Sequence, residues 1–280
     1  MNDVSRSQWL TVIEGSAPII LCVPHAGIEI PAQYSRHLVS PWLARKDTDW
    51  WVDRLYDFAP VLGATVVRTA ISRSIVDANR DPSGASLYPG KPTTALCPTT
   101  TFDGEVLYPD GAEPDAAQIE GRRRCYFDPY HAAIAAQLAR LRHSHPAVVL
   151  YDCHSIRSVV PRLFAGVLPH FNIGTYDGAS CSAQLAAAVE AACDSSGMSR
   201  VTNGRFKGGY TTRHYGDPAR GVHAIQMELA CRGYMSEPDT PCTPANWPPD
   251  YAEKRASRMR ERLTRIIEAC ISFATGGGAR

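Results

Sequence analysis

The sequence lacks the signatures of several broad protein classes. It contains no apolar run long enough to span a membrane, and residues 1–6 show no apolar signal core. Its formal net charge is only +1, so we expect no strongly basic surface for nucleic acid or an anionic membrane. These absences predict a cytoplasmic protein that binds neither nucleic acid nor membranes.

Three common motifs of catalysis and nucleotide binding are also missing. The chain has no Gly-x-Ser-x-Gly, no Walker loop and no Gly-x-Gly-x-x-Gly, which removes the main support for a serine hydrolase, a nucleotide hydrolase or a dinucleotide-binding enzyme. Its nine cysteines are scattered without a Cys-x-x-Cys pair, an arrangement typical of reduced thiols. Cys153 adjoins His154, but neighbouring strand residues point to opposite sides, which argues against a Cys–His dyad.

The composition that is present is that of a folded globular protein. Hydrophobic residues make up 44% and charged residues 20% of the 280 positions, enough to build a sizeable core. Apolar runs predict strands at residues 17–23, 64–71, 147–155 and 222–230, with 171–175 as a strand or a loop, and helical spacing predicts helices at 47–58, 113–142, 181–193 and 251–272. We expect loops at 81–113 and 205–220.

Strands that alternate with helices predict an α/β fold. The alternation indicates βαβ units and therefore a mostly parallel, twisted mixed sheet with helices on both faces. We expect one catalytic domain over residues 1–280. Within the long helix, Arg122, Arg123 and Arg124 are expected to form a solvated face.

Residues 147–155 are the stretch around which we expect the site to be organised. Apolar residues lead into Asp152 and His154, which are two positions apart and so point the same way on a strand. The carboxyl ends of strands are where α/β sheets bind ligands. Taken alone, a short Asp-x-His fits a polar loop closure as well as a ligand site. Three other strands also end near a polar residue, namely His25, Arg73 and Glu228, and at a common edge their side chains would converge.

Converging histidines and carboxylates suggest a catalytic zinc site, which takes three protein ligands and leaves a position for water. His25 and His154 are the histidine candidates, and Asp49 is the preferred acidic ligand. Asp53 lies one turn further along and is the alternative ligand, or a residue that orients a ligand histidine, the role also expected for Asp152. Taken alone, Asp49 fits a helix N-cap better than a metal ligand.

Two further residues would complete such a site. Glu228 would be the general base that takes a proton from the attacking water, and Arg73 would stabilise the oxyanion formed at a carbonyl. A carboxylate on a buried strand is expensive without a partner, which supports a role for Glu228. Arg73 could instead pair with surface acids.

At these residues the chain resembles the N-formylglutamate amidohydrolase family. The matching stretches follow the whole chain in order and are residues 23–27, 47–58, 72–80, 87–90, 97–99, 102–104, 152–155, 207–216 and 226–228. Two positions depart from the expected patterns. Trp51 stands where a histidine is common, and Ile28 replaces the glutamate of the early His-x-x-Glu pair found in the wider group of zinc carboxypeptidases and aspartoacylase.

The resemblance implies a zinc-carboxypeptidase-like (phosphorylase/hydrolase-like) fold with one Zn²⁺ ion, other divalent metals being alternatives. It also implies that Asp77, Asn79 and Arg80 hold a substrate carboxylate. Because the implied substrate is a dicarboxylate, a second bidentate partner is needed, and Arg213 is the candidate. Lys207, Tyr210 and His214 are expected to line the same pocket, and Gly208 and Gly209 to let this loop close over the substrate.

The implied reaction is the hydrolysis of N-formyl-L-glutamate to L-glutamate and formate, a step of histidine degradation. Two alternatives remain at this point. One is a zinc amidase that acts on another N-acyl amino acid or a small peptide. The other is a non-catalytic protein that keeps the fold to bind an acidic metabolite, a reading that the presence of all three ligand candidates and Glu228 disfavours.

Overall fold

A seven-stranded mixed sheet runs through the computed structural model, which describes residues 9–87, 90 and 93–276. The strand order is β1-β3-β2-β4-β7-β5-β6. The strands are β1 (Leu10–Ile13), β2 (Ile19–Val23), β3 (Thr65–Thr69), β4 (Val148–Ile156), β5 (Phe171–Gly174), β6 (Arg200–Thr202) and β7 (Val222–Ala230). Residues 1–8, 88–89, 91–92 and 277–280 lie outside the described residues. Residues 1–6, which show no signal core, and parts of the loop expected at 81–113 and of the matching stretch 87–90 fall among them.

The centre of the sheet is parallel. Strands β3, β2, β4 and β7 pair in parallel, whereas β1 runs antiparallel to β3 and β5 runs antiparallel to β7. All nine residues of β4 are buried, which explains its unbroken apolar start, since a strand covered on both faces has no solvent side. The predicted α/β class and the mostly parallel mixed sheet are confirmed.

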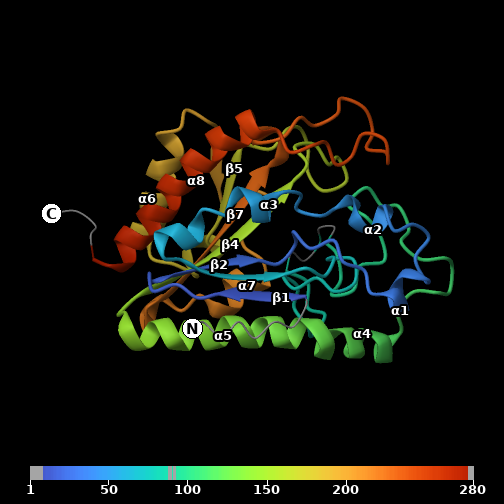
Figure 1. The fold of residues 1–280 in the computed structure, drawn as a ribbon, viewed down its shortest axis with the longest axis horizontal. Helices are drawn as coiled ribbons and strands as arrows, with labels where there is room; N and C mark the ends of the chain where they lie inside the picture. Colours follow the sequence, from blue (N-terminus) through green and yellow to red (C-terminus); the bar gives the residue numbers. More distant parts are fainter. Residues whose placement is uncertain (1–8, 88–89, 91–92, 277–280) are drawn as a thin grey trace.

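Helices cover both faces of the sheet, as expected (Figure 1). The long helix α5 (Asp128–Ser144) lies along one face, where Ile134 and Leu141 pack with Ile20 and Leu150. Helices α6 (Ala183–Asp194) and α8 (Glu253–Ala274) lie on the opposite face. The remaining short helices are α1 (Ala32–Ser35), α2 (Leu43–Lys46), α3 (Val52–Leu55), α4 (Ala116–Arg122) and α7 (Tyr210–Tyr215), with a π-helical turn at Arg123–Phe127 between α4 and α5 and 3₁₀ turns at Ala59–Leu62, Tyr176–Gly178, Pro218–Arg220 and Cys231–Gly233. Among the described residues, no helix combines the length and the apolar character that crossing a membrane requires.

The helix expected at residues 47–58 is much shorter than predicted. Only Val52–Leu55 is α-helical, because Trp51 has the left-handed value φ = 65° and cannot continue a right-handed helix. The indole of Trp51 instead donates a hydrogen bond to the carbonyl oxygen of Pro249 at 3.1 Å. Asp49 therefore lies in a turn before the helix, and its backbone N–H donates to the carbonyl oxygen of His25 at 3.0 Å.

The structure also differs from the predictions at one helix, two edge strands and the arginine run. Residues 210–215 form helix α7 inside the segment expected to be a loop, and the short edge strands β1 and β6 were not predicted. The arginine run does not form one solvated face. Arg122 is buried and donates to the carbonyl oxygen of Ile75 (3.2 Å) and the hydroxyl of Tyr108 (2.9 Å), whereas Arg124 is exposed.

We expect Arg122→Met to lower the free energy of unfolding by about 1–3 kcal/mol, because it leaves the buried acceptors of Ile75 and Tyr108 without a donor. Arg124→Met is the matched control, and should change stability by less than about 0.5 kcal/mol. Urea unfolding monitored by circular dichroism measures both. Equal effects of the two substitutions would contradict a structural role for Arg122.

Candidate active site

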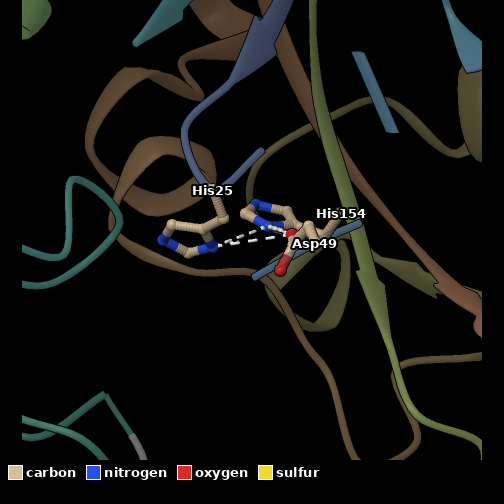
Figure 2. Close-up of side chains that lie close together, drawn as sticks. All are labelled: His25, Asp49 and His154. Carbon is tan, nitrogen blue, oxygen red and sulfur yellow. Dashed lines mark hydrogen bonds and ion pairs between the residues drawn. The ribbon is translucent and has the colours of Figure 1, made fainter. Parts of the chain in front are cut away.

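Three predicted ligand candidates meet in a buried cluster at the carboxyl end of the parallel strands. His25 follows β2, His154 lies on β4, and Asp49 reaches in from the turn before α3. Figure 2 shows the two imidazole rings and the Asp49 carboxylate turned toward one another. One ligand atom from each lies within 4.8 Å of the others. The Nδ1 atom of His154 is 3.1 Å from Nδ1 of His25 and 3.1 Å from Oδ2 of Asp49.

The far nitrogen of each ring is held by a carboxylate. Nε2 of His25 lies 2.6 Å from Oδ1 of Asp77, and Nε2 of His154 lies 3.0 Å from Oδ2 of Asp152. Carboxylates in this position fix the orientation of metal-binding histidines. Asp152 lies against His154, and its expected role of orienting this ring stays a prediction. Asp77, which the resemblance assigned to a substrate carboxylate, instead lies against His25.

This donor set fits a divalent metal ion. With both Nε2 atoms facing carboxylates, the two Nδ1 lone pairs and the Asp49 carboxylate point at the same small region. Three electron-pair donors repel one another there unless a proton or a cation lies between them. Two imidazole nitrogens and one carboxylate oxygen are also the ligand types of catalytic zinc sites.

Arg73 joins the acids of the cluster. Its Nη1 donates to Oδ1 of Asp49 at 3.2 Å and its Nη2 to Oδ2 of Asp77 at 2.8 Å. Burial raises the pKa of Asp77, but the charges of Arg80, His25 and Arg73 outweigh it and hold that pKa well below its usual value. The expected location of Arg73 beside the cluster is thus observed, with two acidic partners that the sequence did not indicate.

Asn79 also contacts this cluster. Its Nδ2 donates to Oδ2 of Asp152 at 2.9 Å, and its Oδ1 accepts from the backbone N–H of Thr211 at 2.8 Å. A Cβ atom at position 209 would lie only 2.3 Å from the Asn79 amide nitrogen, so Gly209 makes room for this side chain. The Asn79 amide is therefore engaged with Asp152. Of Asn79 and Arg80, the two residues expected to hold a substrate carboxylate, Arg80 is the better placed.

Glu228 lies next to the cluster on β7. It is directly paired with His154 in the parallel register of β4 and β7, and its Oε2 accepts from Nε2 of Gln226 at 3.2 Å. Burial raises the pKa of Glu228 to about 8, although the neighbouring His154 lowers it in part. A pKa raised toward neutrality suits a group that both takes up and returns a proton during a reaction.

A cleft of about 630 Å³, including its opening to solvent, gives access to the cluster. His25, His154, Glu228, Arg73, Asn79 and Arg80 all line it. The structure therefore brings most of the predicted site residues together in one place. It also adds Phe102, Arg162 and Arg205 to the walls, none of which the sequence singled out as a site residue.

Four predicted site residues, and Lys207 with them, lie elsewhere. Asp53 is partly exposed and pairs with Arg68 at 3.3 Å, so it neither replaces Asp49 nor orients a ligand histidine. The Arg213 guanidinium lies over the ring of Tyr176, with its carbon 4.6 Å from the ring centroid. Tyr210 and His214 stack on each other on α7. None of these four is among the described residues that line the cleft. Arg213, Tyr210 and His214 lie on helix α7, in the segment that was expected to be a loop. Lys207, expected beside them, pairs with Asp177 at 3.0 Å.

Comparisons with known proteins agree on one family. Residues 17–235 match the family model described as N-formylglutamate amidohydrolase. The chain is 40% identical over 265 residues to N-formylglutamate deformylase of Pseudomonas putida, covering 94% of this chain and 96% of the relative. It is 44% identical over 259 residues to the deformylase of Pseudomonas aeruginosa, covering 92% and 96%.

Two solved structures share the fold. The crystal structure of N-formylglutamate amidohydrolase from Ralstonia eutropha JMP134 superimposes with a TM-score of 0.78 at 22% identity, covering 96% of this chain and 99% of that one. A protein from Agrobacterium tumefaciens superimposes with a TM-score of 0.70 at 19% identity, covering 95% and 96%.

We expect Zn²⁺ binding to the metal-free protein at pH 7 to release protons. Burial lowers the pKa of His154, but Asp152 and Asp49 outweigh it and raise that pKa well above its usual value, so the metal-free ring is protonated and a metal must displace that proton. Zinc affinity should consequently rise with pH. Calorimetry in buffers of different ionisation enthalpy measures the protons released.

Two variants sharpen this experiment. Asp152→Asn should reduce proton release and weaken zinc binding by about 10- to 100-fold, because it removes the carboxylate that holds His154. Asp53→Asn, at an acid outside the cluster, should bind zinc like the wild type. A binding heat at pH 7 that does not depend on the buffer would contradict the protonated state of His154.

Proposed function

Because the chain belongs to the N-formylglutamate amidohydrolase family, we propose that it hydrolyses N-formyl-L-glutamate to formate and L-glutamate. The observation that carries this proposal is the buried convergence of His25, Asp49 and His154 in a cleft that also contains Glu228 and Arg73. The two Pseudomonas relatives named as deformylases align over more than nine-tenths of the chain, which supports the same substrate.

We assign His25, Asp49 and His154 as the residues that hold one zinc ion. Zinc bound there supplies a Lewis acid, which makes water a stronger acid and the formyl carbon a better electrophile. Asp77 and Asp152 keep the two rings in the orientation that presents their Nδ1 atoms.

Glu228 is assigned as the residue that moves the proton. It takes a proton from the attacking water as the new bond to the formyl carbon forms. When the carbon–nitrogen bond of the formamide breaks, Glu228 gives this proton to the departing nitrogen, so that formate and the amine of glutamate result. Its place directly beside His154 on the neighbouring strand puts it at the edge of the ligand cluster.

Arg73 is assigned to the negative charge that develops on the formyl oxygen. Its bonds to Asp49 and Asp77 fix the guanidinium in place, and its carbon lies 4.9 Å from the centroid of the Phe102 ring. A positively charged donor that is already fixed loses little freedom when it stabilises an oxyanion.

Arg80 is assigned to the α-carboxylate of the substrate. Its guanidinium lines the cleft, with Nη2 3.8 Å from Oδ2 of Asp77, and its Nε donates to Thr94 at 3.1 Å. We further propose that the enzyme serves histidine degradation in the cytoplasm. The family membership supports this setting, as do the nine cysteines, all of which are free thiols.

We expect Glu228→Gln to lower the rate of formate release by about 100- to 10,000-fold, because the amide cannot accept the proton of water. Zinc content, measured by atomic emission, should stay at the wild-type value, since Glu228 is outside the ligand set. Asp53→Asn is the control variant and should keep full activity. A Gln variant with wild-type turnover would show that another group is the base.

Metal removal provides a separate test. Dialysis against a chelator should abolish formate release, and one equivalent of Zn²⁺ should restore it. The restored enzyme should act on N-formyl-L-glutamate far better than on N-acetyl-L-glutamate or a small peptide. Full activity in the chelated protein would refute the zinc assignment, and a preference for the other substrates would refute the substrate assignment.

A further inference from the structure

A loop that follows β4 brings an arginine to the outer wall of the cleft. The loop turns at Val160, whose carbonyl oxygen accepts from the N–H groups of Leu163 (2.9 Å) and Phe164 (3.1 Å). Its base is closed by the bond from Leu168 N–H to Ser158 O at 2.9 Å, and Val160 is fully buried in an apolar cluster with Phe102. The loop therefore has a defined structure, and it places Arg162 in the wall of the cleft.

Two neighbouring segments contact this loop. The Arg162 side chain lies over Gly104, where an added Cβ atom would be 3.4 Å from both Cδ and Nε of Arg162. Nε of Arg205 donates to the carbonyl oxygen of Leu163 at 2.8 Å and braces the loop. Arg205 also lines the cleft, so this wall carries positive charge.

Arg162 differs from the inner arginines in its partners. Arg73 binds two carboxylates, and Arg80 lies 3.8 Å from one. Arg162 makes no ion pair and no side-chain hydrogen bond with any residue in the described part of the chain. A guanidinium in the wall of a cleft without an internal acid is suited to an external carboxylate, which it can bind through two parallel hydrogen bonds.

We propose that Arg162 binds the side-chain carboxylate of N-formyl-L-glutamate and selects a dicarboxylate substrate. This inference rests on the proposed function. The formamide nitrogen and the α-carboxylate of the substrate share one carbon, so the α-carboxylate must lie close to the ligand cluster, where Arg80 is found. The side-chain carboxylate is two methylene groups further out. Arg162 comes from an exposed loop position, and it is placed to meet this outer group.

The structure thus gives Arg162 the role that the sequence suggested for Arg213. Arg213 donates through Nε to the carbonyl oxygen of Gly208 at 2.9 Å and lies over the Tyr176 ring, outside the lining of the cleft. Arg213 is therefore a matched control, because it is an arginine of the same charge on a neighbouring segment.

The test compares two substrates that differ in one charge, N-formyl-L-glutamate and N-formyl-L-glutamine. In Arg162→Gln, kcat/KM for N-formyl-L-glutamate should fall by about 10- to 100-fold, mainly through KM, because a charge-assisted pair is lost. For N-formyl-L-glutamine, kcat/KM should change by less than about threefold. The kcat/KM of Arg162→Lys for N-formyl-L-glutamate should lie between the values of the wild type and Arg162→Gln, because lysine keeps the charge but not the bidentate geometry. In Arg213→Gln, the ratio of kcat/KM for the two substrates should stay at the wild-type value.

Two results would overturn the inference. Arg162→Gln could leave the ratio of kcat/KM for the two substrates unchanged, whether both values fall or neither does, or Arg213→Gln could produce the loss of selectivity instead. Zinc content and circular dichroism of each variant identify any loss that comes from unfolding, and Arg162→Lys then supplies the selectivity measurement in a folded protein. Failure of the proposed function looks different, because the wild-type zinc enzyme would then release formate from neither substrate.

Discussion

The site depends on the repulsion between two imidazole nitrogens that face each other in a buried cluster. The Nδ1 atoms of His25 and His154 are 3.1 Å apart, and the carboxylate of Asp49 closes the third side. Asp77 and Asp152 prevent the rings from turning to relieve this contact. Only a proton or a metal ion can make such an arrangement favourable, so the surrounding fold holds a shape that requires a positive charge at its centre.

The rest of the site compensates for burying so many acids. Arg73 binds Asp49 and Asp77 together, and Asn79 binds Asp152. The strands make this possible because β2 and β4 are parallel neighbours and end at the same edge, while β7 places Glu228 beside His154. Positive charge then continues outward through Arg80 to Arg162. In the proposed mechanism, the inner charges serve the metal and the reacting amide, and the outer ones bind the carboxylates of the substrate.

The sequence predicted the parts of the site that lie on long buried strands. His154 and Glu228 were found because each sits on or at the end of an apolar run, and the edge where such runs end in parallel sheets is a known location of ligand sites. The sequence could not decide between Asp49 and Asp53 as the acidic ligand, because the helical spacing of residues 47–58 gives no sign of the left-handed backbone at Trp51. Helix α7 was missed because glycines and aromatic residues resemble a loop. Arg162 has no local signal in the sequence, because only tertiary contacts bring its exposed loop to the cleft.

The most direct test of this account is a crystal structure of the zinc-loaded protein with anomalous data collected at the zinc absorption edge. The account predicts one anomalous peak between Nδ1 of His25, Nδ1 of His154 and the carboxylate of Asp49, with both Nε2 atoms still bonded to Asp77 and Asp152. A zinc ion bound through an Nε2 atom, or at a different set of residues, would contradict it.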